Sequence, residues 1–263
     1  MNVLALDTST STTVAGLCAV EGGSARALSS LSIPPPKKAG ELLPGLLERA
    51  CVDAGLALAE VHAVVVGIGP GSFTGLRVGL AAAKGIAYAR KLPLVGVSSL
   101  RALARRAFAL DANLTALVAA QEARRGEVFL AAYARGPADA RSSSPVSGTH
   151  DLTELLAPAV RLAPVVPQHL HAHATSPLVG AGAVSNRTAL LAAGIPEANL
   201  SHALATQVLS PDALSLVQEA LPQLSHAQFD LTKLFAIAPD YLSESQPELA
   251  LAEGRVGRLT PGS

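Results

Sequence analysis

The segment from residue 62 to residue 91 constrains the fold more than any other part of the sequence. Its first seven residues, HAVVVGI, predict a buried strand, the glycine-rich stretch 69–72 predicts a tight loop, and residues 73–91 predict a long helix. Glycines in the loop allow positive φ angles and the close approach of another backbone segment, and Ser72 is placed to cap the helix. A buried strand that enters a helix through such a loop is typical of α/β proteins.

The flanking segments predict the rest of an α/β unit. Three short apolar runs precede the loop, and their spacing predicts strands joined by tight turns in an antiparallel meander, over 3–6, 13–20 and 26–33. A helix is expected over 41–55, a strand over 94–97 and a helix over 100–109. The first hundred residues therefore predict the order β-β-β-α-β-α-β-α.

A second set of elements begins after Asp111. Strands are expected over 114–120, 127–133 and 178–182, and helices over 151–159, 186–193 and 211–221. We therefore expect a first subdomain over 1–110, a second and divergent one over 111–235, and a C-terminal tail over 236–263.

Composition excludes several classes of protein. Lys plus Arg and Asp plus Glu both number 20, and aromatic residues make up 3% with no Trp, so a stand-alone nucleic-acid binder is disfavoured. Hydrophobic residues make up 49%, enough to bury a sizeable core. The start of the chain lacks the pattern of a secretory signal, and Arg77 and Lys84 interrupt the longest apolar helix. We expect a soluble cytoplasmic protein with Cys18 and Cys51 as buried thiols.

The helix over 73–91 carries two stripes. Small residues recur every four positions at Gly75, Gly79, Ala83 and Ala87, and larger polar residues recur on a different face. A stripe of small residues lets another element approach closely. That element is either a partner protein or this chain's own sheet, and one helix alone does not decide between them.

The loop 69–72 offers backbone N–H groups to an anion, but it matches no common nucleotide motif. No register supplies the Gly-Lys-Ser/Thr of a Walker A loop. A dinucleotide fingerprint that opens at Gly67 places Ser72 where its third glycine belongs, and one that opens at Gly69 places Thr74 there. On spacing alone, the loop predicts a glycine turn and a capped helix.

Several stretches together resemble one known family, that of TsaB (YeaZ). The most specific is GPGSFTGLRVG at 69–79, and the others are LALDTST at 4–10, LLP at 42–44, ARRGEVF at 123–129, VGVSSL at 95–100 and PDYL at 239–242. The resemblance is strong over residues 1–133 and weak beyond, apart from PDYL.

This resemblance implies an actin-like (ASKHA, ribonuclease-H-like) fold with two related subdomains. It implies a non-catalytic scaffold that binds and activates TsaD, the metal-holding enzyme that makes threonylcarbamoyladenosine at position 37 of tRNAs reading codons that start with A. A TsaE-family ATPase joins the pair, tRNA is met only through the complex, and no membrane is involved. The chain would have no cofactor or metal of its own, with ATP or ADP held at the complex interface.

The resemblance also assigns the docking surface to the helices over 41–55 and 73–91. The same surface would form a homodimer when the chain is alone. The expected partner-binding residues are Leu43, Leu46, Leu47, Ala50, Gly75, Leu76, Gly79, Ala83 and Ala87.

The opening LALDTST resembles the first phosphate loop of the actin-like fold, where a carboxylate organises hydrated Mg²⁺. The residues that would contact a nucleotide are Asp7, Thr8, Ser9, Thr10, Gly69, Gly71 and Ser72. The usual glycine of that loop is missing, and Gln121 and Glu122 stand where the family tends to have aspartate. Asp7 therefore either organises a metal or accepts hydrogen bonds from its own turn.

An enzyme of the actin-like fold, a metalloprotease or an ATPase, is the main alternative. The HxxxH metal pair of catalytic relatives is not found on a predicted helix. His169, His171 and His173 alternate in a Pro-rich stretch, which favours a surface loop over a metal site. A free-standing tRNA binder is the second alternative, with Arg101, Arg105 and Arg106 either steering RNA or forming solvated surface charge.

Overall fold

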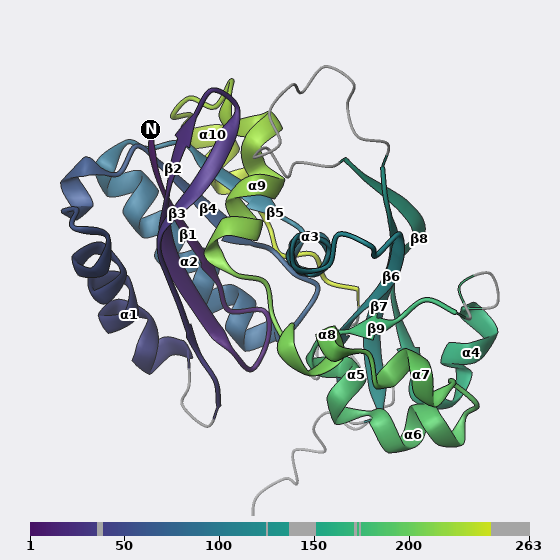
Figure 1. Ribbon diagram of the computed structural model, residues 1–263. Coiled ribbons are helices and arrows are strands. Elements are labelled where there is room, and N and C mark those ends of the chain that lie inside the picture. Colours follow the sequence, from purple (N-terminus) through teal and green to yellow (C-terminus); the bar gives the residue numbers. More distant parts are fainter. Residues whose placement is uncertain (36–38, 125, 137–150, 171–172, 174, 243–263) are drawn as a thin grey trace, which may run out of the picture.

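The computed structural model describes residues 1–242 except 36–38, 125, 137–150, 171–172 and 174. Two sheets, each with helices against it, make up the described chain (Figure 1). Among the described helices, none is long and apolar enough to cross a bilayer.

The first sheet confirms the predicted meander followed by parallel strands. Its spatial order is β3 (Ser24–Ile33), β2 (Thr13–Glu21), β1 (Asn2–Asp7), β4 (Ala63–Gly67) and β5 (Leu94–Val97). Neighbours among β1, β2 and β3 pair antiparallel, whereas β4 pairs parallel with both β1 and β5. The central strands β1 and β4 are buried on both faces, which explains their continuous apolar runs.

The second sheet repeats this order with one strand fewer. It runs β8 (Leu152–Leu162), β7 (Glu127–Arg135), β6 (Ala116–Glu122) and β9 (Leu178–Val179). Here β6 pairs antiparallel with β7 and parallel with β9, so β6 takes the place that β1 has in the first sheet. Two copies of one topology confirm the actin-like fold class with two related subdomains.

The prediction of a helix over 151–159 is wrong, because those residues belong to strand β8. Leu152, Leu155 and Leu156 are spaced as in a helix, but antiparallel pairing with β7 holds the segment extended. As the edge strand of the sheet, β8 tolerates Pro158 and stays largely exposed.

Helices cover both faces of the first sheet (Figure 1). On one face, α1 (Ala39–Ala54) and α2 (Phe73–Arg90) pack against alternate residues of β1 and β4. On the other, α9 (Ala213–Leu224) packs through its apolar side and contacts every strand of the first sheet. Sequence analysis placed α9 in the second subdomain, but α9 packs against the sheet of the first. The subdomain boundaries near residues 110 and 235 stay a prediction.

The remaining helices surround the second sheet or return to the first. They are α3 (Ser99–Leu110), α4 (Val166–His169), α5 (Ala181–Ser185), α6 (Arg187–Ala192), α7 (Glu197–Leu200), α8 (Ala203–Gln207) and α10 (Leu231–Ala236). Short 3₁₀ turns lie at η1 (Leu58–Glu60) and η2 (Ala163–Val165). After α10, which packs against α2, the Asp240 N–H donates to the Ile68 carbonyl at 2.7 Å, and Leu242 packs against the second core. The end of the described chain thus spans both subdomains.

Candidate functional site

The carboxylate of Asp7, at the end of β1, is committed to hydrogen bonds inside the protein. Its Oδ1 accepts from the N–H and the hydroxyl of Ser9 at 2.8 and 2.6 Å, and its Oδ2 accepts from the Ser99 hydroxyl at 2.5 Å. The side chain is fully buried, and a Cβ added at Gly67 would lie 1.7 Å from Oδ2. Of the two interpretations of Asp7, this geometry fits hydrogen bonding within the turn.

Burial also shifts the pKa of this carboxyl group. Desolvation raises the pKa of the Asp7 carboxyl above its ordinary value of 3.8, and the hydrogen bonds from Ser9 and Ser99 act in the opposite direction. Because the donors come from two separate parts of the first subdomain, Asp7 links β1 to the start of α3.

The glycine-rich loop and the start of α2 press directly on the turn after β1. The Thr8 hydroxyl donates to the Gly75 carbonyl at 2.7 Å, and the Ser72 N–H donates to the Ser9 carbonyl at 2.7 Å. An added Cβ would lie 2.2 Å from the Ser9 carbonyl oxygen at Gly71, and 2.0 Å from the Thr8 carbonyl oxygen at Gly75. These glycines are therefore required because two backbones touch.

The residues expected to contact a nucleotide are gathered here, yet their polar groups serve the fold. Asp7, Thr8 and Ser9 are fully buried, and the Ser72 hydroxyl accepts from the Gly75 N–H as the cap of α2. The Thr10 hydroxyl donates to the Thr12 carbonyl at 2.9 Å. Nucleotide binding by these residues stays a prediction. In the structure, the turn after β1 and the glycine-rich loop 69–72 are in direct contact.

Eight of the nine residues expected to bind a partner are buried in this chain's own core. All but the half-buried Leu47 are buried: Leu43, Leu46, Ala50, Gly75, Leu76, Gly79, Ala83 and Ala87. The apolar side of each helix faces the first sheet, as in most amphipathic helices. The two glycines of the small-residue stripe thus fit against Thr8, since a Cβ at Gly79 would lie 2.2 Å from its hydroxyl oxygen.

The outer sides of α1 and α2 carry a second set of small residues that sequence analysis missed. Ala81, Gly85 and Ala89 recur every four residues on α2 and are exposed, as is Gly45 on α1. A Cβ added at Gly45 or Gly85 would meet nothing within 4 Å. Glycine inside a helix lowers its stability. Gly45 and Gly85, both inside predicted helices, are therefore the sequence signal that could have located this surface.

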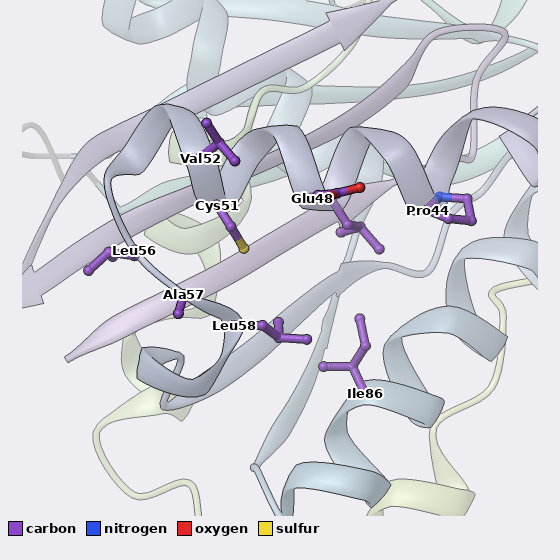
Figure 2. A pocket seen from close by; sticks show the side chains of 9 residues that line it. Pro44, Glu48, Cys51, Val52, Leu56, Ala57, Leu58 and Ile86 are labelled. Atoms are coloured by element: carbon purple, nitrogen blue, oxygen red, sulfur yellow. The ribbon is translucent and has the colours of Figure 1, made fainter.

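An apolar pocket of about 440 Å³ opens between these helices. Figure 2 shows side chains from α1, η1 and α2 around it, with Leu58 and Ile86 on its lower side. It is lined by Pro44, Leu47, Glu48, Cys51, Val52, Leu56, Ala57, Leu58 and Ile86. Glu48 is the one charged residue in that lining, and Val52 is 67% exposed at its edge.

In the second subdomain, Gln121 near the end of β6 occupies the position that corresponds to the end of β1. Its side chain is fully buried, and neither its amide nitrogen nor its amide oxygen has a hydrogen-bond partner. A Cβ at Gly182 would lie 2.5 Å from the Gln121 backbone, so α5 approaches β6 as closely as α2 approaches the turn after β1.

The arginines on α3 form ion pairs with acidic side chains of α9 and of the residue before it. Arg101 and Arg105 both contact Glu219 of α9, at 2.7 and 2.8 Å, and Arg106 lies 3.4 Å from Asp212. These pairs join α3 to α9, so the cluster is neither a free RNA-steering patch nor purely solvated charge.

Of the three alternating histidines, His169 and His173 belong to the described residues, and these two form no metal site there. The His169 ring lies 3.0 Å from the Val165 carbonyl oxygen, and His171 falls outside the described residues. Within the part of the chain that the structure describes, no cluster of three or more His, Cys, Asp or Glu side chains is placed to hold a metal ion.

The fold and this site define a class: an actin-like protein in which the turn after β1 packs directly against the glycine-rich loop before α2. A family model described as "TsaD: tRNA N6-adenosine threonylcarbamoyltransferase" matches residues 36–246. The TsaB proteins of Escherichia coli and Haemophilus influenzae, called tRNA threonylcarbamoyladenosine biosynthesis proteins, are each 36% identical over 135 residues. That stretch covers 51% of this chain but 56% and 55% of theirs, so the chain spans about half the length of the curated relatives it matches.

The solved structure of YeaZ from Pseudomonas aeruginosa is similar over nearly the whole chain. Its TM-score is 0.67 at 25% identity, and the alignment covers 92% of this chain and 99% of that one. The chain therefore belongs to the TsaD-type family that the model describes, and its relatives place it with the TsaB (YeaZ) proteins, as the motif GPGSFTGLRVG predicted.

Proposed function

We propose that this chain is a non-catalytic subunit of the system that makes threonylcarbamoyladenosine in tRNA. It binds and activates a TsaD-type catalytic protein, which transfers the threonylcarbamoyl group to adenosine 37 of tRNAs reading codons that start with A. The names of the TsaB relatives support the pathway, and the match to a TsaD-type family model supports a shared fold with the catalytic partner.

The observation that carries this proposal is the open surface on the outer sides of α1 and α2. Gly45 and Gly85 each cost the helix about 1 kcal/mol relative to Ala, and no contact within the described chain offsets that cost. A partner helix that approaches the backbone at these positions gives them a use. The adjacent apolar pocket, with Val52 and Leu58 exposed beside it, offers the partner a place for an apolar side chain.

The polar groups near the glycine loop support a non-catalytic role. The Asp7 carboxylate and the hydroxyls of Ser9 and Ser99 hydrogen bond to one another, so none is presented to a substrate. An ATPase or metalloprotease needs a free carboxylate or nucleophile at a hollow in the surface. Any ATP or ADP is therefore expected at the interface with the TsaD-type partner, where a TsaE-family ATPase also joins.

Self-association follows from the same surface. One face buries one partner at a time, so a homodimer through α1 and α2 and the complex with a TsaD-type protein exclude each other. The contact to tRNA in the reaction is made in the assembled complex.

Reconstituted modification tests the proposal. A TsaD-type protein from the same organism, supplied with tRNA and threonylcarbamoyl-adenylate, is expected to form more modified adenosine when this chain is added, whereas the chain alone forms none. Gly85→Arg is expected to remove the stimulation, and Ala192→Arg, at an exposed position of α6, is the matched control. Modification by the chain without the TsaD-type protein, or full stimulation by Gly85→Arg, would overturn the proposal.

A further inference from the structure

The exposed aromatic side chains of this protein gather along one side of α2. Of the eight Phe and Tyr residues, Phe108, Phe129 and Tyr133 are buried in the second core and Phe229 packs on the first. Tyr88, Phe235 and Tyr241 are 57%, 64% and 44% exposed, and Phe73 is half-buried. In a chain with so few aromatic residues, this concentration of exposed rings indicates a binding surface.

These four rings form two pairs, one toward each end of α2. The rings of Phe73 and Tyr241 have centroids 5.0 Å apart, and those of Tyr88 and Phe235 lie 6.4 Å apart. Residues 231–242 therefore run beside α2 in the opposite direction, and each pair takes one ring from each segment. Phe73 and Tyr88 are fifteen positions apart in the helix, a distance of about 22 Å along the axis.

Basic side chains lie on the same side of the helix. Arg77, Lys84 and Lys91 fall within about 60° of Phe73 and Tyr88 around the helix axis. The Arg77 guanidinium lies 3.8 Å from the Phe73 ring centroid and donates to the Tyr241 hydroxyl at 3.1 Å. The Lys84 ammonium donates to the Phe235 carbonyl at 3.0 Å, so both cations are held beside the rings.

The charge of this side is uniformly positive along α2. The sequence of α2 contains no Asp or Glu, whereas α1 carries Glu41, Glu48 and Asp53. In the segment that runs beside α2, the Asp230 carboxylate caps α10 by accepting from two backbone N–H groups, and Asp240 is half-buried. The zero net charge of the chain thus conceals a local basic surface that complements a polyanion.

We propose that this aromatic–basic stripe, made of Phe73, Arg77, Lys84, Tyr88, Lys91, Phe235 and Tyr241, binds single-stranded RNA. Exposed rings stack on unpaired bases, and neighbouring cations contact the phosphates, which is how proteins recognise single strands. The overall composition disfavours a nucleic-acid binder, but it averages over a surface on which these residues are concentrated. The stripe lies on the side of α2 away from α1, so it does not rest on the docking proposal.

Fluorescence anisotropy of the full chain, in low salt, with a labelled 12-nucleotide RNA tests this assignment. We expect saturable binding that the double change Tyr88→Ala with Phe235→Ala weakens by about tenfold or more. Lys84→Gln is expected to lower the slope of log affinity against log salt by about 1. The matched control is Val52→Ala with Leu58→Ala, which truncates two exposed apolar residues on the α1 side and is expected to leave binding unchanged.

The same assay with competitors separates stacking from charge alone. Unlabelled single-stranded RNA is expected to compete better than a duplex of the same sequence or than heparin, which has no bases. Equal competition by heparin, or no effect of the ring changes, would overturn the proposal. So would the absence of RNA binding, including the case in which the ring variants lose binding to the TsaD-type protein and the chain binds no RNA. Gly85→Arg is expected to keep RNA binding, so failure of the docking proposal and failure of this one give different results.

Discussion

The two sides of α2 carry the same kind of residue in opposite surroundings. On the inner side, Gly75 and Gly79 leave no room for a Cβ because Thr8 lies 2.0 to 2.2 Å from where it would stand. On the outer side, Gly85 has nothing within 4 Å. A repeat of small residues therefore indicates that something approaches the helix closely, but the chain's own packing decides whether that neighbour is internal or a partner.

The largest effect is expected on the inner side. Gly75→Ala forces its Cβ into the Thr8 carbonyl, a backbone atom that cannot turn away, so we expect the free energy of unfolding to fall by about 3 kcal/mol. Urea denaturation followed by circular dichroism measures the change. A loss of less than about 1 kcal/mol would mean that the contact between α2 and the turn is looser than described.

The second effect is a pH dependence at the turn on which α2 rests. Burial raises the pKa of Asp7 in the folded protein, so folding favours its protonated form, and the charged form lowers stability as pH rises above its ordinary value of 3.8. In the Asp7→Asn variant, the side chain at this position has no titratable group. The stability of the wild type minus that of the variant is therefore expected to fall as pH increases from about 4, and to level off above the raised pKa.

This difference is read from urea denaturation of both proteins at a series of pH values. A difference that does not change with pH, or that rises with pH, would show that the hydrogen bonds from Ser9 and Ser99 outweigh desolvation.

A small gain is expected on the outer side. Gly85→Ala makes the same chemical change as Gly75→Ala in the same helix, but the added methyl group enters open space. Removing a helix-interior glycine is expected to raise the free energy of unfolding by about 0.5–1 kcal/mol. The pair of variants is a matched test, and equal signs for the two would remove the distinction between the sides.

The smallest effect is a severalfold change in thiol reactivity. Cys51 lines the pocket beside α2, whereas Cys18 is fully buried in the first sheet, where burial raises its pKa to about 12. A small disulfide reagent at pH 8 is expected to modify Cys51 slowly in the free chain and more slowly still with a TsaD-type partner present. Cys18 is the internal control and is expected to stay unmodified in the folded protein, and an unchanged Cys51 rate would place the partner elsewhere.

Sequence analysis predicted the elements whose pattern is local. Strand β5 was predicted at its observed bounds, because a short apolar run between a helix end and a Ser cap leaves little choice. Strand β8 was missed because pairing with β7 overrides the helical spacing of its leucines. Of the short helices, α6 was predicted, whereas α4, α5, α7, α8 and α10 were missed, since so few residues carry only a weak period.

The candidate site was predictable only in part. The residues expected to contact a nucleotide came from both loops, Asp7 and Gly71 among them, but the direct backbone contact between these loops was not predicted. Which side of α2 faces the sheet depends on the rotation of the helix about its axis. Because α2 carries small residues on both sides, its sequence does not indicate this rotation strongly. The pocket beside Cys51 was not predictable, because it needs η1 and α2 to lie against α1.

Light scattering after size-exclusion chromatography, on this chain mixed with the TsaD-type protein of the same organism, tests the docking surface most directly. The account predicts that a homodimer of the chain converts to a 1:1 complex, that Gly85→Arg remains folded but forms neither species, and that Ala192→Arg forms both. A Gly85→Arg variant that joins the TsaD-type protein at normal yield would contradict it, because the outer sides of α1 and α2 would then not be the surface that the partner covers.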